Sequence, residues 1–119
     1  MKGFEMEFNT AFQFVPIDKR RTVSKPRKSG ITMVSDYQLG LASLSDLIEV
    51  AGHYIDLFKI ATGTSRLFGK THLQAKIEML RANHIRPFLG GQFQEYVIHT
   101  MGIDAMPRHL SEAQALGFD

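Results

Sequence analysis

Apolar and polar positions along the chain follow two periods, and together they predict consecutive strand and helix units. Three apolar runs are short, partly β-branched and followed by small or polar residues, which is typical of buried parallel strands. These runs are residues 30–36, residues 54–65, which include the turn at the end of the run, and residues 85–89. Segments with apolar residues at helical spacing follow them, at residues 41–51, 71–83, 92–100 and 107–116. The pattern therefore predicts three βα units, and Phe118 and Asp119 are expected to begin a fourth strand.

Local signals refine the ends and faces of these elements. Gly52 and Gly117 are expected to terminate the helices before them, Gly52 in the left-handed conformation. In the segment 71–83, Leu73, Ile77 and Leu80 form the inward stripe, and Lys76 is expected to face water. Strand starts recur at intervals of about 25 to 30 residues, as right-handed parallel crossovers require. A barrel and a doubly wound sheet both fit, while the glycine motifs of dinucleotide and P-loop sites are missing.

The second apolar run contains the sharpest chemical signal. It carries Asp56 and Lys59 and then ends in Gly63-Thr64-Ser65. A lysine in an apolar strand must find an anion, so Lys59 is expected to face a carboxylate, a phosphate or a substrate. Asp56 is a poor partner, because residues three apart on a strand point to opposite faces, whereas an ion pair with Glu95 remains open.

Other candidates lie where the predicted strands end, since ligands of parallel α/β sheets bind at that edge. Asp36 could hold a hard cation, and Glu95 could be a second ligand or a general acid or base. Hydroxyl groups and glycine backbone suited to an anion or a close ligand are supplied by Thr64, Ser65, Gly90 and Gly91.

The segment before the first strand is phenylalanine-rich and then basic. We expect residues 1–24 to form an arm whose phenylalanines, including Phe12 and Phe14, pack on the barrel floor or on a partner subunit. Six basic residues fall within 19–28. A solvated linker is one interpretation, and another is that Lys25 and Arg27 hold an anionic ligand or pair with carboxylates.

Composition narrows the function classes. The 119 residues are 44% hydrophobic and 22% charged, which is ordinary globular material for one domain. A net charge of +2 and a basic run without interleaved aromatic residues argue against nucleic-acid binding. No cysteine is present and the histidines lack ligand spacing, so a zinc site is not expected. No apolar stretch is long enough for a membrane span, and we expect a cytoplasmic protein without membrane contact.

Several of these residues, taken in order, resemble the phosphosulfolactate synthase family. The segments that carry the resemblance are Lys25-Pro26-Arg27, 30–32, Asp36, 52–59, 63–65, 76–77, 90–95 and 116–118. Members of that family are TIM-barrel enzymes that use Mg²⁺ to add sulfite to phosphoenolpyruvate in coenzyme M biosynthesis. The resemblance therefore implies the fold of the N-terminal part of a (β/α)8 TIM barrel, with residues 25–119 forming strands 1–3 and their helices around a parallel sheet.

The resemblance also implies roles for the candidate residues. Lys59 would neutralise the substrate's phosphate or carboxylate, Asp36 and Glu95 would serve the metal, and Glu95 would also serve the proton transfer after sulfite attack. Lys25, Arg27, Thr64, Ser65, Gly90 and Gly91 would contact the small anionic substrate.

Two segments depart from the family pattern. The family often has Phe-Gly-Trp-Gly-Thr where this chain has Ile60-Ala61-Thr62-Gly63-Thr64, and Gln92 stands where a threonine is usual. The alternative is a non-catalytic or divergent member that acts as an interaction or stress-related protein. A TIM barrel needs roughly 250 residues, so the chain is either a fragment of a longer polypeptide or a half-barrel that covers its open edges by self-association as a homo-oligomer. We expect the 119 residues alone to be inactive.

Overall fold

A computed structural model of the protein describes residues 10–119 and contains one three-stranded parallel sheet. The strands are β1 (Met33–Asp36), β2 (Leu57–Ile60) and β3 (Arg86–Leu89), in the spatial order β1-β2-β3. Ser35, Lys59 and Phe88 occupy one row across the sheet. Each strand thus pairs with the next one in the chain, which is the order found in a (β/α) barrel.

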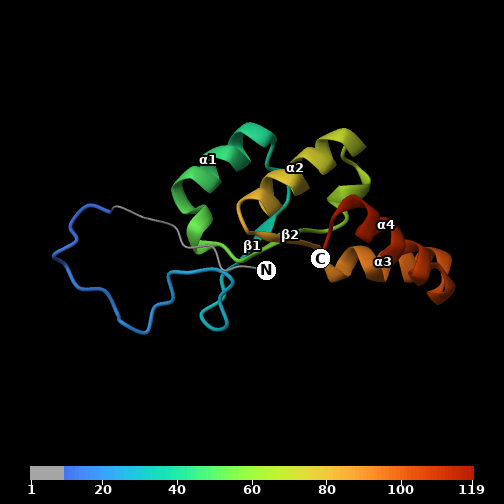
Figure 1. Cartoon of the computed structure of the whole chain (residues 1–119). Helices are drawn as coiled ribbons and strands as arrows, with labels where there is room; N and C mark the ends of the chain where they lie inside the picture. Colours follow the sequence, from blue (N-terminus) through green and yellow to red (C-terminus); the bar gives the residue numbers. More distant parts are fainter. Residues whose placement is uncertain (1–9) are drawn as a thin grey trace.

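Helices connect the strands and cover one face of the sheet. The crossover from β1 to β2 contains α1 (Leu41–Ala51) and the short 3₁₀ helix η1 (Gly52–Tyr54). The next crossover contains η2 (Thr64–Arg66) and α2 (Lys70–Ala82). After β3 come α3 (Gly91–Met101), η3 (Ile103–Ala105) and α4 (Met106–Leu116), with α4 against α3 (Figure 1). This is the N-terminal part of a TIM barrel, as the sequence predicted.

The core lies between the sheet and the helices that cover it. Phe58 and Ile60 of β2 are fully buried there, together with Leu44 of α1 and Ile77 of α2. Because side chains alternate along a strand, Leu57 and Lys59 point to the opposite face, which no helix covers within the described residues. In a closed barrel that face is the interior.

The chain ends at the position expected for a fourth strand. Gly117 follows α4 with a φ of +102°, so it ends that helix in the left-handed conformation. Phe118 then enters the core, and the Asp119 amide donates to the Pro87 carbonyl of β3 (2.9 Å). This is the same kind of contact that joins each strand to the preceding one.

Two expectations about faces and ends were wrong. Gly52 has right-handed helical angles and begins η1, so α1 ends without a left-handed residue. Lys76 is fully buried instead of facing water. Phe12 and Phe14 are mostly exposed within this chain, so their packing on a partner subunit stays a prediction, and the arm's other phenylalanines lie outside the described residues. The segment before β1 extends away from the helices as a loop (Figure 1).

None of the helices in the described part of the chain is long and apolar enough to cross a membrane.

Candidate functional site

The carboxyl ends of the three strands meet at one edge of the sheet. Backbone hydrogen bonds continue the ladder there, from the Ala61 amide to the Asp36 carbonyl (2.9 Å) and from the Gly90 amide to the Ile60 carbonyl (3.3 Å). The loops that follow β1, β2 and β3 therefore begin side by side. Ligands of parallel α/β folds bind at this edge, so its side chains form the candidate site.

Lys59 is the only predicted catalytic residue that lies within a strand. Its side chain is half-buried on the open face, in the row between Ser35 and Phe88. Neither Asp56 nor Glu95 pairs with it, and among residues 10–119 its ammonium group has no hydrogen-bond or ion-pair partner. A partly desolvated cation without a counter-ion is a binding site for an anion.

Gly90 and Gly91 shape the space beside Lys59. A Cβ atom at Gly90 would lie 3.5 Å from Cδ and 3.7 Å from Cε of Lys59, so the lysine stem runs directly over this glycine. Gly91 begins α3, and a Cβ there would meet nothing within 4 Å. The first amides of α3 therefore lie one residue from the lysine stem, where a helix start favours negative charge.

The turn after β2 is strained and attached to α3. Thr62 has a φ of +56°, which is uncommon for a β-branched residue, and its hydroxyl donates to the Gln92 side-chain oxygen (3.2 Å). Gly63 follows with a φ of +73°, close to the Phe93 ring. Thr62 and Gln92, which both depart from the family pattern, thus contact each other between this turn and α3, which the sequence did not predict.

The predicted hydroxyl ligands of this turn are directed inward. The Thr64 hydroxyl donates to the Ala61 carbonyl (2.9 Å), where it holds the turn closed. The Ser65 hydroxyl is buried and has no hydrogen-bond partner among the described residues. The turn places both residues at the correct edge, but its backbone and Thr62 are better exposed to a ligand than these two hydroxyl groups.

Asp36 lies at the end of β1 but faces the helices. One carboxylate oxygen accepts hydrogen bonds from the amides of Gln38 (3.0 Å) and Leu39 (2.8 Å). The other forms a fully buried ion pair with Lys76 of α2. These contacts give Asp36 a structural role and leave no oxygen facing the open side of the sheet, so the expectation that it binds a metal is not supported by its geometry.

Glu95 lies in the second turn of α3 and is exposed. Its carboxylate forms no ion pair with any described residue, so it remains available for chemistry. Within residues 10–119 no group of three histidine or acidic side chains could hold a metal ion.

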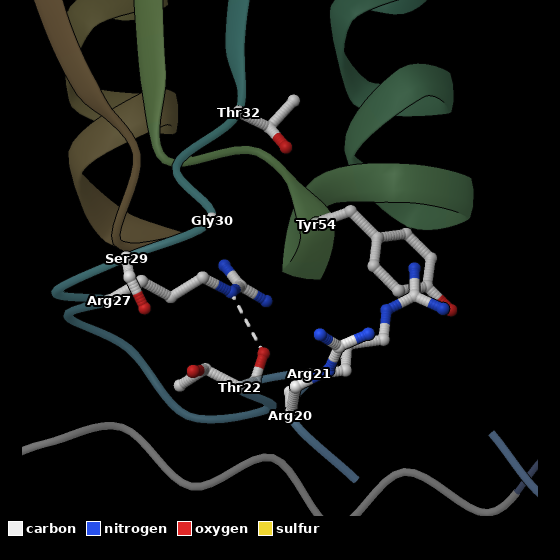
Figure 2. Close-up of a pocket in the computed structure, with 8 residues that line it drawn as sticks. All are labelled: Arg20, Arg21, Thr22, Arg27, Ser29, Gly30, Thr32 and Tyr54. Carbon is white, nitrogen blue, oxygen red and sulfur yellow. Dashed lines mark hydrogen bonds between the residues drawn. The ribbon is translucent and has the colours of Figure 1, made fainter. Parts of the chain in front are cut away.

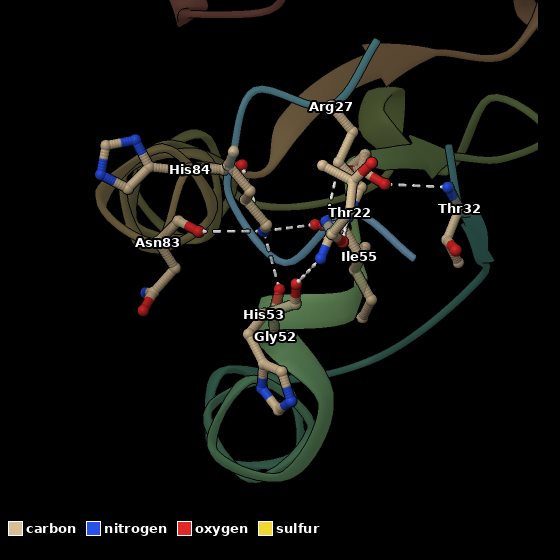
Figure 3. Close-up of polar contacts among 10 residues, drawn as sticks. Thr22, Arg27, Thr32, Gly52, His53, Ile55, Asn83 and His84 are labelled. Carbon is tan, nitrogen blue, oxygen red and sulfur yellow. Dashed lines mark hydrogen bonds and ion pairs between the residues drawn. The ribbon is translucent and has the colours of Figure 1, made fainter. Parts of the chain in front are cut away.

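Lys25 and Arg27 lie at the opposite, amino-terminal edge of the sheet. The Lys25 ammonium is buried and donates to backbone carbonyls that follow α1 and α2, among them Gly52 (2.8 Å) and Ile55 (2.5 Å) (Figure 3). Burial lowers the pKa of Lys25 to about 8, and the nearby Asp56 carboxylate partly opposes this. Lys25 therefore joins the two crossovers and is separated from Lys59 by the length of the strands.

Arg27 forms a second link at that edge. It donates to the Asp56 carboxylate (2.7 Å) and to the His53 carbonyl (2.5 Å), and Asp56 also accepts from the Thr32 amide (2.9 Å) (Figure 3). The interpretation that Arg27 pairs with a carboxylate is thereby confirmed. Neither Lys25 nor Arg27 reaches the edge that carries Lys59, so we do not include them in the candidate site.

The chain is similar to a known protein family over most of its length. The family model described as (2R)-phospho-3-sulfolactate synthase (ComA) matches residues 20–119, which include all the described strands and helices. The chain belongs to this family. The resemblance inferred from the sequence motifs is therefore confirmed.

Curated phosphosulfolactate synthases are similar in sequence to the chain. That of Methanothermobacter thermautotrophicus is 38% identical over 95 residues, and that of Methanocaldococcus jannaschii is 30% identical over 109 residues. These alignments cover 80% and 92% of this chain. A third, from Bacillus subtilis, is 37% identical over 75 residues, or 62% of this chain. The matched region spans only 36%, 39% and 29% of these phosphosulfolactate synthases, respectively.

Proposed function

We propose that this chain supplies the N-terminal strands and the anion-binding lysine of a phosphosulfolactate synthase-like enzyme. The observation that carries the proposal is the position of Lys59, a half-buried cation at the carboxyl edge of the sheet, without an acidic partner in the described part of the chain. Membership in the family supports phosphoenolpyruvate and sulfite as the substrates. No feature of the described residues favours the alternative of a non-catalytic interaction protein.

The chemistry proposed for the site needs positive charge on the open face of the sheet. When sulfite adds to phosphoenolpyruvate, a carbon–sulfur bond forms, the double bond opens, and negative charge develops next to the substrate carboxylate until a proton arrives at that carbon. Lys59 would bind the phosphate or the carboxylate and stabilise this charge. The amides that begin α3 at Gly91 would add a second, weaker attraction for the same anion.

Glu95 is the candidate for proton transfer because its carboxylate is exposed and unpaired on the helix that follows β3. We retain a magnesium requirement as part of the proposal, on the basis of the resemblance. Since Asp36 is paired with Lys76, Glu95 is the one predicted ligand left in this region. Further metal ligands would come from the other strands of a complete barrel.

The test is the substitution Lys59→Met in a protein that includes the remaining barrel strands. Methionine keeps the length and packing of the lysine stem over Gly90 but removes its charge. We expect phosphosulfolactate formation from phosphoenolpyruvate and sulfite to fall by at least about a hundredfold, since such electrostatic contacts are typically worth this much. The matched control is Lys70→Met, which removes an exposed lysine at the start of α2.

Unchanged turnover in a folded Lys59→Met protein would exclude the proposed role of Lys59. Activity of the isolated 119-residue chain would contradict the expectation that three strands are insufficient. Phosphosulfolactate is assayed directly in both cases. For Lys59→Met, the change in KM and the change in kcat distinguish a loss of substrate binding from a loss of chemistry.

A further inference from the structure

The amino-terminal edge of the sheet contains a pocket that the proposed function does not use. Its volume is about 220 Å³. Figure 2 shows its lining, which comes from the segment that leads into β1 and from the end of η1. The lining residues are Arg20, Arg21, Thr22, Arg27, Ser29, Gly30, Thr32 and Tyr54.

Among the described residues, the three arginines at this pocket pair with two carboxylates, those of Asp18 and Asp56. Arg27 is paired with the buried Asp56, and Arg20 is paired with Asp18 in a bridge whose side chains are 90% and 55% exposed. An ion pair as exposed as the second contributes little and exchanges easily with solvent or a ligand. The guanidinium of Arg21 has no acidic partner among the described residues and lies 5.0 Å from the centre of the Tyr54 ring. The pocket therefore has an excess of positive charge.

A neighbouring histidine reports the same excess. Burial lowers the pKa of His53, and the positive charges of Lys25, Arg27 and Arg21 lower it further. These three cations lie on the same segment before β1, and His53 lies in η1, which carries the pocket residue Tyr54. The direction of the His53 pKa shift thus follows from the same arginines that line the pocket and agrees with a positive potential here.

The remaining lining groups are neutral and can donate hydrogen bonds. Thr22, Ser29 and Thr32 each bring a hydroxyl group, and none of these hydroxyls is used as a donor within the described residues. Gly30 has a φ of +66°, and a Cβ atom there would meet nothing within 4 Å, so the backbone is open to the pocket. Planar guanidinium groups combined with hydroxyl donors match the oxygens of phosphate and sulfate groups.

We propose that this pocket binds a small oxyanion of the phosphate or sulfate class, at a site separate from the one that contains Lys59. Arg20 and Arg21 would contact the anion, and the Asp56 pair would hold Arg27 in position at the pocket wall. The two sites lie at opposite edges of strands of four residues, roughly 13 Å apart along the strands. The proposal does not depend on the proposed function.

The experiment is a titration of the 119-residue chain with inorganic phosphate, followed by amide chemical shifts at constant ionic strength. We expect saturable shifts at Gly30 and Thr32. Arg21→Gln should weaken phosphate binding at least about tenfold, because it removes the one pocket arginine without a carboxylate partner. Arg20→Gln, on the exposed loop, provides a second variant should Arg21→Gln fail to fold. Arg108→Gln, an exposed arginine of α4, is the matched control and should bind phosphate as the natural chain does.

The same titration in Lys59→Met separates the two sites. Shifts at Gly30 and Thr32 with an unchanged dissociation constant in that variant would support a distinct pocket. Loss of those shifts in Lys59→Met would overturn the proposal, because it would assign the anion to the candidate active site. Phosphate binding that survives in the double variant Arg20→Gln/Arg21→Gln would also overturn it, and so would the absence of saturable shifts at Gly30 and Thr32 in the natural chain.

Discussion

At the scale of single residues, the described chain uses its buried charges in two different ways. Lys25 and Lys76 are both buried and are both occupied by protein groups, carbonyl oxygens for Lys25 and the Asp36 carboxylate for Lys76. Lys59 is only half-buried and has no such partner among residues 10–119. The presence or absence of a protein partner thus distinguishes the structural lysines, Lys25 and Lys76, from Lys59, which is available to a ligand. Variants of the structural lysines are therefore a useful comparison for a Lys59 variant.

Lys76→Met tests the structural class. Removing one partner of a buried ion pair leaves the Asp36 carboxylate uncompensated in the core, so the free energy of unfolding should fall by about 3–5 kcal/mol. Urea unfolding followed by circular dichroism measures the change. Lys70→Met, which alters an exposed lysine on the same helix, should change it by less than about 0.5 kcal/mol.

A second variant distinguishes the charge from the packing. Asp36→Asn combined with Lys76→Met removes both charges while the side-chain oxygen of residue 36 still accepts the Gln38 and Leu39 amides. It should recover part of the lost stability. If Lys76→Met alone proves as stable as Lys70→Met, then the ion pair does not contribute as its burial indicates.

At the scale of elements, the hydrophobic pattern was sufficient for the order and type of every strand and long helix. It worked because each helix must present a continuous apolar stripe to the sheet, and that stripe is a local property of the sequence. The face of Lys76 was predicted wrongly, although Leu73, Lys76, Ile77 and Leu80 have the spacing of a single inward stripe. The prediction followed the charge of Lys76 and not its position in the stripe. Its partner, Asp36, lies 40 positions earlier in the chain and cannot be identified from the helix sequence alone.

Gly117 is the residue on which the end of α4 depends. Its φ is +102°, and a Cβ atom there would lie 2.9 Å from Cγ2 of Ile77, which belongs to the core. Gly117→Ala should therefore lower the free energy of unfolding by about 1–3 kcal/mol through backbone strain and overpacking. The change should also weaken the Asp119 contact with β3, visible as faster hydrogen exchange of the Asp119 amide.

Gly91→Ala is the control for that substitution. Gly91 lies in the first turn of α3, its Cβ position is open, and alanine favours a helix over glycine by up to about 1 kcal/mol. The control should be neutral or stabilising. Equal stability of Gly117→Ala and Gly91→Ala would show that α4 can end without a glycine at position 117.

At the scale of the whole molecule, the sequence predicted that the candidate site lies at the carboxyl edge of the sheet. It also assigned to that site residues that lie at the opposite edge. Lys59, Gly90 and Gly91 were predicted there because strand ends are readable from the pattern, and the structure places them together. Lys25 and Arg27 could not be separated from them by sequence, because a residue shortly before a strand and one at its end are close in number but lie at opposite edges. The contact between Thr62 and Gln92 depends on how the turn after β2 meets the start of α3, which no local pattern encodes.

The open face of the sheet leads to the last prediction. On that face Met33 is 52% exposed, Leu57 and Phe88 are partly exposed, and β1 has no neighbour on its outer edge within the described residues. An apolar sheet face with an unpaired edge associates with another surface of the same kind, so we expect the isolated chain to form oligomers as its concentration rises. Sedimentation velocity over a concentration series measures this.

Met33→Lys, which places a charge on the open face, should shift the chain toward the monomer, while Val50→Lys on the exposed side of α1 should not. A natural chain that remains monomeric at every concentration would contradict self-association, and equal effects of the two lysine substitutions would show that the association uses a different surface.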